Sequence, residues 1–185
     1  MGSLSEAQHS LITGTLLGDG AMRCKANALL EINHSAHQRS YVDWKFQLLA
    51  DLVSTPPKLR QGNGGRMAYR FTTRSLPQLT SLYGEFYRDG GKHVPKMELT
   101  PLALAVWFMD DGSRSRSSVY LNTQQFDIDC QVLLLSLLWE QWGIEAALNR
   151  DKQYMRIRVT TGSVGRLARA IEPYLLPEFS YKLPQ

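Results

Sequence analysis

The chain has 185 residues, 43% of them hydrophobic, which is enough to bury a core as one domain or as two small ones. Its 21 Lys and Arg against 17 Asp and Glu give a net charge of +4, a mild basic excess that suits a polyanionic partner without requiring one. Cys24 and Cys130 lack metal-type spacing and indicate reduced thiols in an intracellular protein, so no zinc site is expected. The longest apolar run, 132–139, is far shorter than the roughly 20 residues that cross a bilayer, and no signal-peptide pattern opens the chain. We therefore expect no membrane partner.

The first predicted helix contains an apolar run at 11–17 and is followed by Asp19 and Gly20. Ser5 and Gln8 form the capping-box signature that marks a helix start. Gly20 lies where a left-handed C-terminal cap is expected. The acid is unusual, because a carboxylate in the last turn faces the negative end of the helix dipole at a cost of roughly 0.3–1 kcal/mol. A bound cation would offset that cost.

The rest of the first half reads as hairpins and helices in alternation. Strands are indicated by alternating apolar residues, and helices by apolar residues spaced three or four positions apart. In chain order we predict a hairpin at 22–35 that turns near 25–27, a helix from Tyr41 to Val53, a hairpin at 58–73, and a helix that Ser75 caps and that ends at Tyr87.

A second copy of the first motif lies near the middle of the chain, where an apolar run at 104–109 ends in Asp111 and Gly112. Thr100 and Pro101 supply an N-cap and a first-turn proline for this helix. Gly112, like the first glycine, lies at the place of a left-handed cap. The motif is therefore repeated with its start and stop signals.

The elements after the second motif repeat those after the first. The match runs through short segments, since Phe71, Thr72 and Thr73 return as Val159, Thr160 and Thr161. In order we predict a strand at 119–123, a helix at 132–142 closed by Gly143, a hairpin at 144–161 that turns at Asp151 and Lys152, and a helix that Ser163 caps and that ends at Tyr174.

Two apolar helices that each end in an acid and a glycine resemble the motif of the LAGLIDADG homing endonucleases, and the resemblance covers nearly the whole chain. It implies an α+β fold in which an αββαββα unit is duplicated with pseudo-twofold symmetry, forming saddle-shaped antiparallel sheets with helices on the other face. We expect the halves to span 1–98 and 99–185 and to share one active centre. A repeat on one chain also implies a monomer.

The resemblance implies a metal-dependent active site. Asp19 and Asp111 would bind Mg²⁺, which Ca²⁺ or Mn²⁺ can replace in binding or cleavage, aided by the backbone near Gly18 and Asp110. Asp110 could instead coordinate the metal itself or cap the helix. Family members also carry a polar residue at the end of the strand after each motif and a basic residue beyond each half's last helix. The polar residues correspond to His34, or its neighbour Asn33, and Gln124, or its neighbour Thr123; the basic residues correspond to Lys92, or Lys96, and Lys182.

In the predicted hairpins, residues alternate between the two faces of the strand. Arginine recurs at the positions of the polar face, while apolar residues such as Ile157 and Val159 occupy the positions of the other face. A β-ribbon fits the major groove of DNA, where Arg discriminates guanine by roughly 1–3 kcal/mol per bidentate pair. We expect DNA contacts from Arg23, Lys25, Asn27, Arg66, Arg70, Thr72, Arg114, Arg116, Tyr120, Asn122, Tyr154, Arg156, Arg158 and Thr160.

The resemblance implies a site-specific double-strand DNA endonuclease of the intron- or intein-associated homing type, with a long, near-palindromic or asymmetric duplex as its partner. Two alternatives share the fold. One is an RNA maturase that assists splicing of its host group I intron, and the other is a catalytically dead DNA-binding regulator, which retention of Asp19 and Asp111 disfavours. The expected location is intracellular, in a chloroplast, a mitochondrion or the bacterial cytoplasm.

Overall fold

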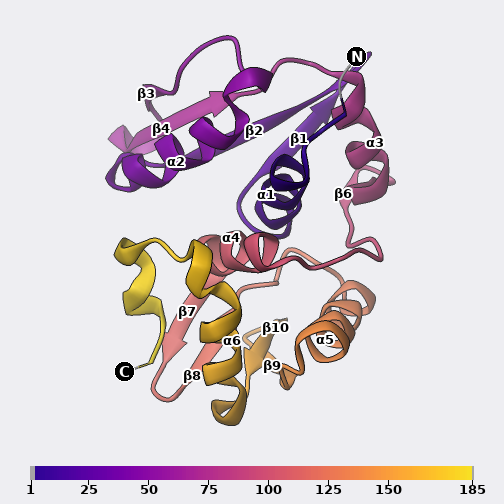
Figure 1. Cartoon of the computed structure of the whole chain (residues 1–185), viewed down its shortest axis with the longest axis vertical. Helices are drawn as coiled ribbons and strands as arrows, with labels where there is room; N and C mark the ends of the chain where they lie inside the picture. The colour runs from indigo at the N-terminus through magenta and orange to yellow at the C-terminus, as the bar shows by residue number, and fades with distance from the viewer. Residues whose placement is uncertain (1–2, 185) are drawn as a thin grey trace. The chain divides into compact units, whose positions relative to one another are not determined.

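The computed structural model describes residues 3–184, and the chain divides into two compact units, 1–84 and 85–185. Each unit contains a four-stranded antiparallel sheet together with helices (Figure 1). In both, the motif helix is followed by the predicted order of hairpin, helix, hairpin and helix. The duplicated α+β fold that the sequence predicted is therefore confirmed.

The first unit begins with the first motif helix and ends within α3. Its helices and strands are α1 (Glu6–Leu17), β1 (Ala21–Cys24), β2 (Ala28–Ser35), α2 (Arg39–Leu49), β3 (Lys58–Gln61), β4 (Met67–Thr72) and α3 (Pro77–Phe86), with short 3₁₀ turns at Ala36–Gln38, Ala50–Leu52 and Asn63–Gly65.

The second unit adds a small two-stranded ribbon before its motif helix. Its elements are β5 (Tyr87–Arg88), β6 (Gly91–Lys92), α4 (Pro101–Asp111), β7 (Gly112–Ser115), β8 (Ser118–Leu121), α5 (Ile128–Trp142), β9 (Ala146–Asp151), β10 (Tyr154–Val159) and α6 (Val164–Ile171), with 3₁₀ turns at Thr161–Ser163, Glu172–Tyr174 and Pro177–Lys182.

Both sheets have the same strand order. It is β1-β2-β4-β3 in the first unit and β7-β8-β10-β9 in the second. One face of each sheet packs against a helix, α2 on β2 and β4 and α5 on β9 and β10. Ile157 and Val159 are buried on that face, while Arg158 between them is exposed. The alternation read from the sequence therefore separates a core face from a polar face.

The helix-start signals of both motifs are confirmed. Ser5 Oγ accepts a hydrogen bond from the Gln8 N–H at 3.2 Å, and Gln8 Oε1 accepts one from the Ser5 N–H at 3.0 Å. Thr100 caps α4 by accepting from the Ala103 N–H at 3.2 Å. These local bonds satisfy N–H groups that have no partner inside the helix.

The predicted Ser75 cap is wrong, whereas Ser163 lies at the predicted N-cap position of α6; both serine hydroxyls form tertiary contacts rather than cap bonds. The helix α3 begins at Pro77, and the Ser75 hydroxyl donates to the Asn27 carbonyl at 2.7 Å, which ties the helix entry to the β1–β2 turn. The Ser163 hydroxyl accepts from the Glu145 N–H at 2.9 Å and makes no cap bond to α6.

Helix α5 starts at Ile128, earlier than the predicted Val132, because Asp127 caps it by accepting from the Cys130 N–H at 2.7 Å. Its predicted end is confirmed, since Gly143 adopts the left-handed conformation with φ 59°.

The predicted left-handed caps at Gly20 and Gly112 are wrong. Gly112 has φ −67°, and among the described residues Gly20 is not in the left-handed region either. The reason for glycine is close packing. A Cβ at Gly20 would lie 2.2 Å from Thr15 Cγ2, and one at Gly112 would lie 2.4 Å from the Phe108 carbonyl oxygen. Both distances are impossible for a real side chain, so each turn from helix to strand requires glycine.

Strand pairing shows which residues of the two sheets correspond. Ala21, two residues after the first motif's acid, pairs with Glu31. Ser113, two residues after the second motif's acid, pairs with Tyr120. Glu31 and Tyr120 are therefore counterparts.

The next strand extends this correspondence. Glu31 pairs with Thr72, and Tyr120 pairs with Arg158. The counterpart of Thr72 is therefore Arg158 and not Thr160, so the match of residues 71–73 with 159–161 read from the sequence is wrong in register. The connections between elements differ in length in the two halves, and a short sequence match cannot place such differences.

Within residues 3–184, none of the helices combines the length with the apolar character that crossing a membrane requires.

Candidate active site and nucleic-acid interface

The second motif helix presents two acids at a rigid end. Residues 102–109 of α4 are buried, whereas Asp110 and Asp111, its last two residues, are half-buried. The Gly112 N–H donates to the Phe108 carbonyl and closes the last turn. The helix therefore fixes the backbone from which both carboxylates project.

Lys182 supplies the positive charge that the helix end requires. Its side chain is buried, at 8% exposure, and its Nζ donates to the Met109 carbonyl at 2.6 Å and to the Asp110 carbonyl at 3.2 Å. Carbonyls of the last turn have no donor within the helix, and a cation there interacts favourably with the helix dipole. The chain itself thus places a basic group beside the acids of the second motif.

Asn122 holds the same helix end from the sheet. Its backbone N–H and its side-chain Nδ2 both donate to the Asp111 carbonyl, at 3.1 and 2.9 Å. These bonds fix the backbone of Asp111 between α4 and the end of β8. Sequence reasoning placed Asn122 among DNA contacts and did not foresee this role.

Gln124 and Thr123 have different environments. Gln124 Nε2 donates to Asp151 Oδ2 at 3.0 Å, whereas the buried Thr123 hydroxyl donates to Gln131 Oε1 of α5 at 3.3 Å. Glu31 and Tyr120 are counterparts, and His34 and Thr123 each lie three residues after them. Thr123, rather than Gln124, is therefore the counterpart of His34 in the second unit.

Asp19 lies beyond its helix rather than in the last turn. Helix α1 ends at Leu17 with Gly18 as its C-cap, so the acid begins the short connection to β1. The Asp19 side chain is 54% exposed, and its Oδ2 lies 3.8 Å from Nδ1 of His34, whose side chain is only 3% exposed. The structure thus brings together Asp19 and His34, two residues that the sequence assigned to the site separately, while Asn33 is exposed on the other face of β2.

Lys45 and Tyr41 lie next to His34 in the first unit, and the sequence analysis did not identify either residue as part of the site. Lys45 has 0% exposure, its Nζ is 3.3 Å from His34 Nε2, and it lies 4.4 Å from the centre of the Tyr41 ring. Together they fix the histidine ring from the side away from Asp19. The available signal was a lysine four residues after Tyr41, on the apolar stripe of the predicted helix.

The alternatives for the first basic residue differ in their surroundings. Lys92 closes β6, and its Nζ donates to Gln125 Oε1 at 3.1 Å. Lys96 is exposed in the connection to α4.

The donors at each motif end, taken separately, are of the kind that a hard divalent cation prefers. Asp19, Asp110 and Asp111 offer carboxylate oxygens, and Gly18 offers a backbone carbonyl oxygen at the end of its helix. Mg²⁺ and Ca²⁺ prefer such all-oxygen ligands. The donor chemistry therefore suits the metal that the sequence predicts.

The polar face of the first sheet carries several of the predicted DNA contacts. Arg70 is exposed and pairs across the strands with Asn33, while Arg23 forms an ion pair with Glu31. A hollow on this face is lined by Arg23, Glu31, Thr55, Pro56, Lys58, Arg60, Arg70, Phe71 and Thr72. The face is thus basic with one acid, and it includes Lys58 and Arg60, for which the sequence left open a phosphate contact or a solubilising charge.

The turns of the first unit hold the other predicted contacts. Lys25 and Arg66 are exposed at the β1–β2 turn and just before β4. Asn27 is half-buried, and its carbonyl is already used by the Ser75 hydroxyl. Asn27 therefore has a clear structural role in holding the entry to α3.

The polar face of the second sheet is ordered by its own contacts. The Arg156 guanidinium lies 3.9 Å from the centre of the Tyr120 ring, and its NH1 donates to Asn122 Oδ1 at 3.3 Å. Such stacking restricts the arginine before any ligand binds. By the strand correspondence, Asn122 and Arg156 are the counterparts of Asn33 and Arg70, so both sheets carry an Asn and an Arg at the same place.

Other predicted contacts of the second unit are distributed more widely. Arg158 and Tyr154 are exposed on β10, and Arg158 Nε donates to Ser118 Oγ at 3.1 Å. Arg116 lies in the β7–β8 turn with φ 49°. Arg114 departs from the polar face, because it pairs with the buried Val119 and shares its face. Thr160 directly follows β10, and its hydroxyl oxygen is buried without a hydrogen-bond partner.

Comparison with known proteins identifies relatives of the whole chain. Residues 9–167 match the model of the LAGLIDADG DNA endonuclease family. Protein RecA of Mycobacterium gastri is 29% identical, with the match covering 97% of this chain and 48% of that protein. Cytochrome b mRNA maturase bI2 of Debaryomyces hansenii is 28% identical, covering 97% of this chain and 74% of the maturase. The chain thus spans about half the length of the RecA relatives that it matches.

Solved structures share the fold. The homing endonuclease I-WcaI bound to its DNA recognition sequence superposes with a TM-score of 0.90 at 23% identity, covering 99% of this chain and 88% of that one. I-DmoI in complex with DNA and Ca superposes with a TM-score of 0.61 at 11% identity, covering 94% of this chain and 95% of that one. The match extends over almost all elements of both units.

Proposed function

Because this chain belongs to the LAGLIDADG DNA endonuclease family, we propose that it is a site-specific double-strand DNA endonuclease of the homing type that hydrolyses phosphodiesters with Mg²⁺. Two structural neighbours, I-WcaI and I-DmoI, support this proposal, since they are homing endonucleases bound to DNA, one of them with calcium. An intracellular site of action follows, because genomic and intron targets lie inside cells.

The main observation in favour of this proposal is the hydrogen bonding at the end of α4. Asp110 and Asp111 project from a helix end that the buried Lys182 and Asn122 hold through four hydrogen bonds to the carbonyls of residues 109–111. Burying a lysine is costly unless its ammonium is hydrogen-bonded, and here two bonds go to the backbone that bears the acids. Such an arrangement keeps the carboxylates in place for a ligand.

In the proposed reaction, Asp19 and Asp111 hold the metal, with the Gly18 carbonyl and Asp110 as further oxygen donors. The metal, when bound, makes a water nucleophilic and neutralises charge on the phosphate. His34 orients the Asp19 carboxylate from 3.8 Å away. The Lys182 ammonium offsets the negative end of the α4 dipole and holds the backbone carbonyls of Met109 and Asp110, which directly precede Asp111.

Two other residues that the sequence assigned to the active site, Gln124 and Lys92, are also included in the proposed reaction. Gln124 would order water near the scissile phosphate, and Lys92 would supply the first-half positive charge. Both are half-buried polar side chains, and the hydrogen bonds from Gln124 to Asp151 and from Lys92 to Gln125 are ones that a nucleic acid or water can replace.

DNA recognition is assigned to the polar faces of the two sheets. Their arginines lie on regular strands, where Arg70 and Arg158 are exposed and Arg156 is held by Tyr120. Rigid presentation reduces the entropy lost when a side chain meets a base edge. Lys58 and Arg60 beside Arg70 suit phosphate oxygens, which position the duplex.

A second candidate function is an RNA maturase that assists splicing of its host intron. The observation that favours it is the likeness to cytochrome b mRNA maturase bI2 along 97% of this chain. A maturase uses binding surfaces rather than carboxylates. Its activity would therefore survive the loss of Asp19 and Asp111, whereas DNA cleavage would not.

The proposal is tested by changing each acid to Asn. For Asp19→Asn and Asp111→Asn we expect Mg²⁺-dependent cleavage to fall by about a hundredfold or more, because a metal ligand contributes several kcal/mol to the transition state. Binding of the target in Ca²⁺ should persist, since the sheets rather than the acids hold the duplex. Nicking and double-strand cleavage are measured alongside binding on the same preparations.

Asp89→Asn is the matched control, because Asp89 is exposed and its backbone, at φ 50°, suits Asn equally well. This variant should cleave like the parent. Parental cleavage by Asp19→Asn or Asp111→Asn would refute the assignment of the active site, and retained intron splicing without cleavage in both would favour the maturase.

A further inference from the structure

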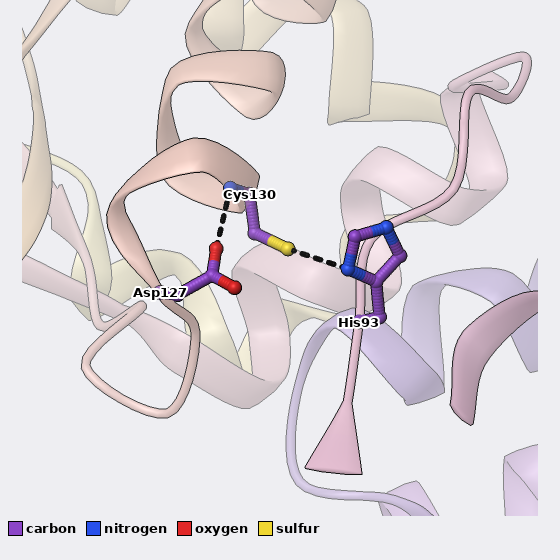
Figure 2. A group of neighbouring side chains, drawn as sticks. All are labelled: His93, Asp127 and Cys130. Carbon is purple, nitrogen blue, oxygen red and sulfur yellow. Dashed lines mark hydrogen bonds between the residues drawn. The ribbon is translucent and has the colours of Figure 1, made fainter. Parts of the chain in front are cut away.

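Three side chains that the proposed reaction does not use gather in the second unit. Figure 2 shows His93, from the segment after β6, facing Cys130 and Asp127 at the start of α5. Each offers one ligand atom, and the three atoms all lie within 4.8 Å of one another. Cys130 Sγ lies 3.2 Å from His93 Nδ1. Residues distant in sequence thus form a compact group of nitrogen, sulfur and oxygen donors.

Two groups around Cys130 would stabilise a negatively charged sulfur once a cation is bound. The side chain is 2% exposed, and its Sγ accepts a hydrogen bond from the Val94 N–H at 3.3 Å. Cys130 also lies in the first turn of α5, where the helix dipole is positive. A metal-bound thiolate in this position would be stabilised by both groups.

Asp127 is held ready as a ligand. Its Oδ1 accepts the Cys130 N–H at 2.7 Å as the cap of α5. That hydrogen bond lowers the pKa of the Asp127 carboxyl, so the group is ionised at neutral pH. The cap uses one oxygen, and the other oxygen of this exposed carboxylate can turn to a cation.

We propose that His93, Asp127 and Cys130 bind a zinc-class divalent cation, with water as the fourth ligand. Bond lengths of about 2.0–2.3 Å in tetrahedral zinc sites put neighbouring ligand atoms roughly 3.3–3.8 Å apart, and the sulfur and nitrogen are already close to that spacing. A thiolate and an imidazole select zinc over Mg²⁺, so this site differs in metal class from the carboxylates of the motif helices.

Metal binding replaces a proton here. Burial raises the pKa of the Cys130 thiol, so without a cation the sulfur is protonated at neutral pH. The cation displaces that proton and binds the thiolate, as at other cysteine sites.

The site would fasten the segment that joins the two motifs to the core of the second unit. His93 directly follows Lys92, and Asp127 and Cys130 belong to the helix that packs on β9 and β10. A cation that binds only the folded chain raises stability by mass action. We therefore assign the site a structural role.

The proposal is tested with Co²⁺, which replaces zinc and reports its ligands by colour, added to the full chain in excess Mg²⁺. We expect one equivalent of Co²⁺ to give a thiolate charge-transfer band and tetrahedral d–d bands, which one equivalent of Zn²⁺ then removes. The charge-transfer band can arise only from a cysteine, so metal at the carboxylates of the motif helices does not produce it. Absence of this band in the parent overturns the proposal.

Variants identify the ligands. Cys130→Ser should lose the band, whereas Cys24→Ser, which changes the other cysteine, should keep it. Asp127→Asn preserves the helix cap, because Asn caps as well as Asp, so it remains folded while its affinity for the cation falls by about tenfold or more. A parental band in Cys130→Ser, or parental affinity in Asp127→Asn, overturns the assignment.

Proteolysis gives an independent measurement. Trypsin cleaves after Lys92, directly before His93, and Zn²⁺ should slow that cleavage in the parent but not in His93→Gln. Cleavage after Arg60, in the first unit, is the internal control and should not respond to Zn²⁺. Equal cleavage after Lys92 with and without Zn²⁺ would contradict the proposal that a cation at His93, Asp127 and Cys130 holds this segment in place.

Discussion

Lys45 and Lys182 are the buried lysines of the described residues, and each touches a group assigned to the proposed active site. Lys45 lies against His34, and Lys182 binds the carbonyls of Met109 and Asp110. A buried ammonium is tolerated only where hydrogen bonds replace its water shell. At the scale of single residues, these two lysines hold the functional groups in position.

Changing Lys182 to Met should lower the free energy of unfolding by about 1–3 kcal/mol, because two carbonyls at the end of α4 lose a charged donor. Denaturant titration measures the change. Lys58→Met, at an exposed position on β3, is the control and should alter stability by less than about 0.5 kcal/mol. Equal stability of Lys182→Met and the parent would show that the buried bonds contribute nothing.

Arg70 and Arg158 should each read one or two positions of the DNA target. We expect Arg70→Ala and Arg158→Ala to relax the preference at those positions by about 1–3 kcal/mol and to leave the other positions unchanged. Profiling of cleavage on a randomised target library measures this. Arg88→Ala, which removes an exposed arginine outside both large sheets, should leave the profile unaltered. A positionally uniform loss for Arg70→Ala or Arg158→Ala would identify that residue as a phosphate contact instead.

At the scale of elements, the turns from the motif helices into β1 and β7 depend on close packing. Gly20 and Gly112 have no room for a Cβ, because the strand starts against the backbone or side chain of the last helical turn. This tight exit brings the acid, the helix end and the first strand together. The sequence indicated a glycine with a special role but assigned that role to backbone conformation.

Gly112→Ala should destabilise the protein by at least about 2 kcal/mol, because the new methyl group would sit 2.4 Å from the Phe108 carbonyl oxygen and force the turn to shift. The matched control is Gly84→Ala in α3, where no atom lies within 4 Å of the new Cβ. It should stabilise the helix by about 0.5–1 kcal/mol. Thermal and denaturant unfolding compare the two, and a Gly112→Ala protein as stable as the parent would remove the packing explanation.

The strand registers show that a repeat found in the sequence does not determine which residues of the two sheets correspond. Thr72 corresponds to Arg158 through strand pairing, although the sequence matched it to Thr160. Alternation has a period of two, so a shift by two residues preserves every apolar and polar position and leaves the pattern unchanged. Only the hydrogen-bonded pairing distinguishes the two registers.

For the whole molecule, the duplication predicts that one chain carries both motif helices and needs no second copy. Sedimentation equilibrium without DNA should give the mass of a single chain at micromolar concentration. The measurement repeated in Ca²⁺ with duplex target should give one chain per duplex. A dimer in either condition would contradict the proposal that both halves act from one chain.

The linear chain was sufficient to predict the class of fold, the two motif helices with their N-terminal caps, the hairpin positions and the split of each sheet into a core and a polar face. These features depend on interactions between residues a few positions apart, such as the bonds of Ser5 with Gln8 and of Thr100 with Ala103. Local spacing and hydrogen-bonding chemistry are visible in a linear chain.

Which side chains meet across long sequence separations could be seen only in the folded protein. It placed Lys45 against His34, Lys182 at the end of α4, and Cys130 beside His93, although the sequence had indicated an ordinary thiol. Each contact depends on how a helix packs on a registered sheet or on where a connecting segment returns. Periodicity shows that a residue faces the core but carries no information on which distant residue faces it there, because that partner is selected by packing and by strand pairing.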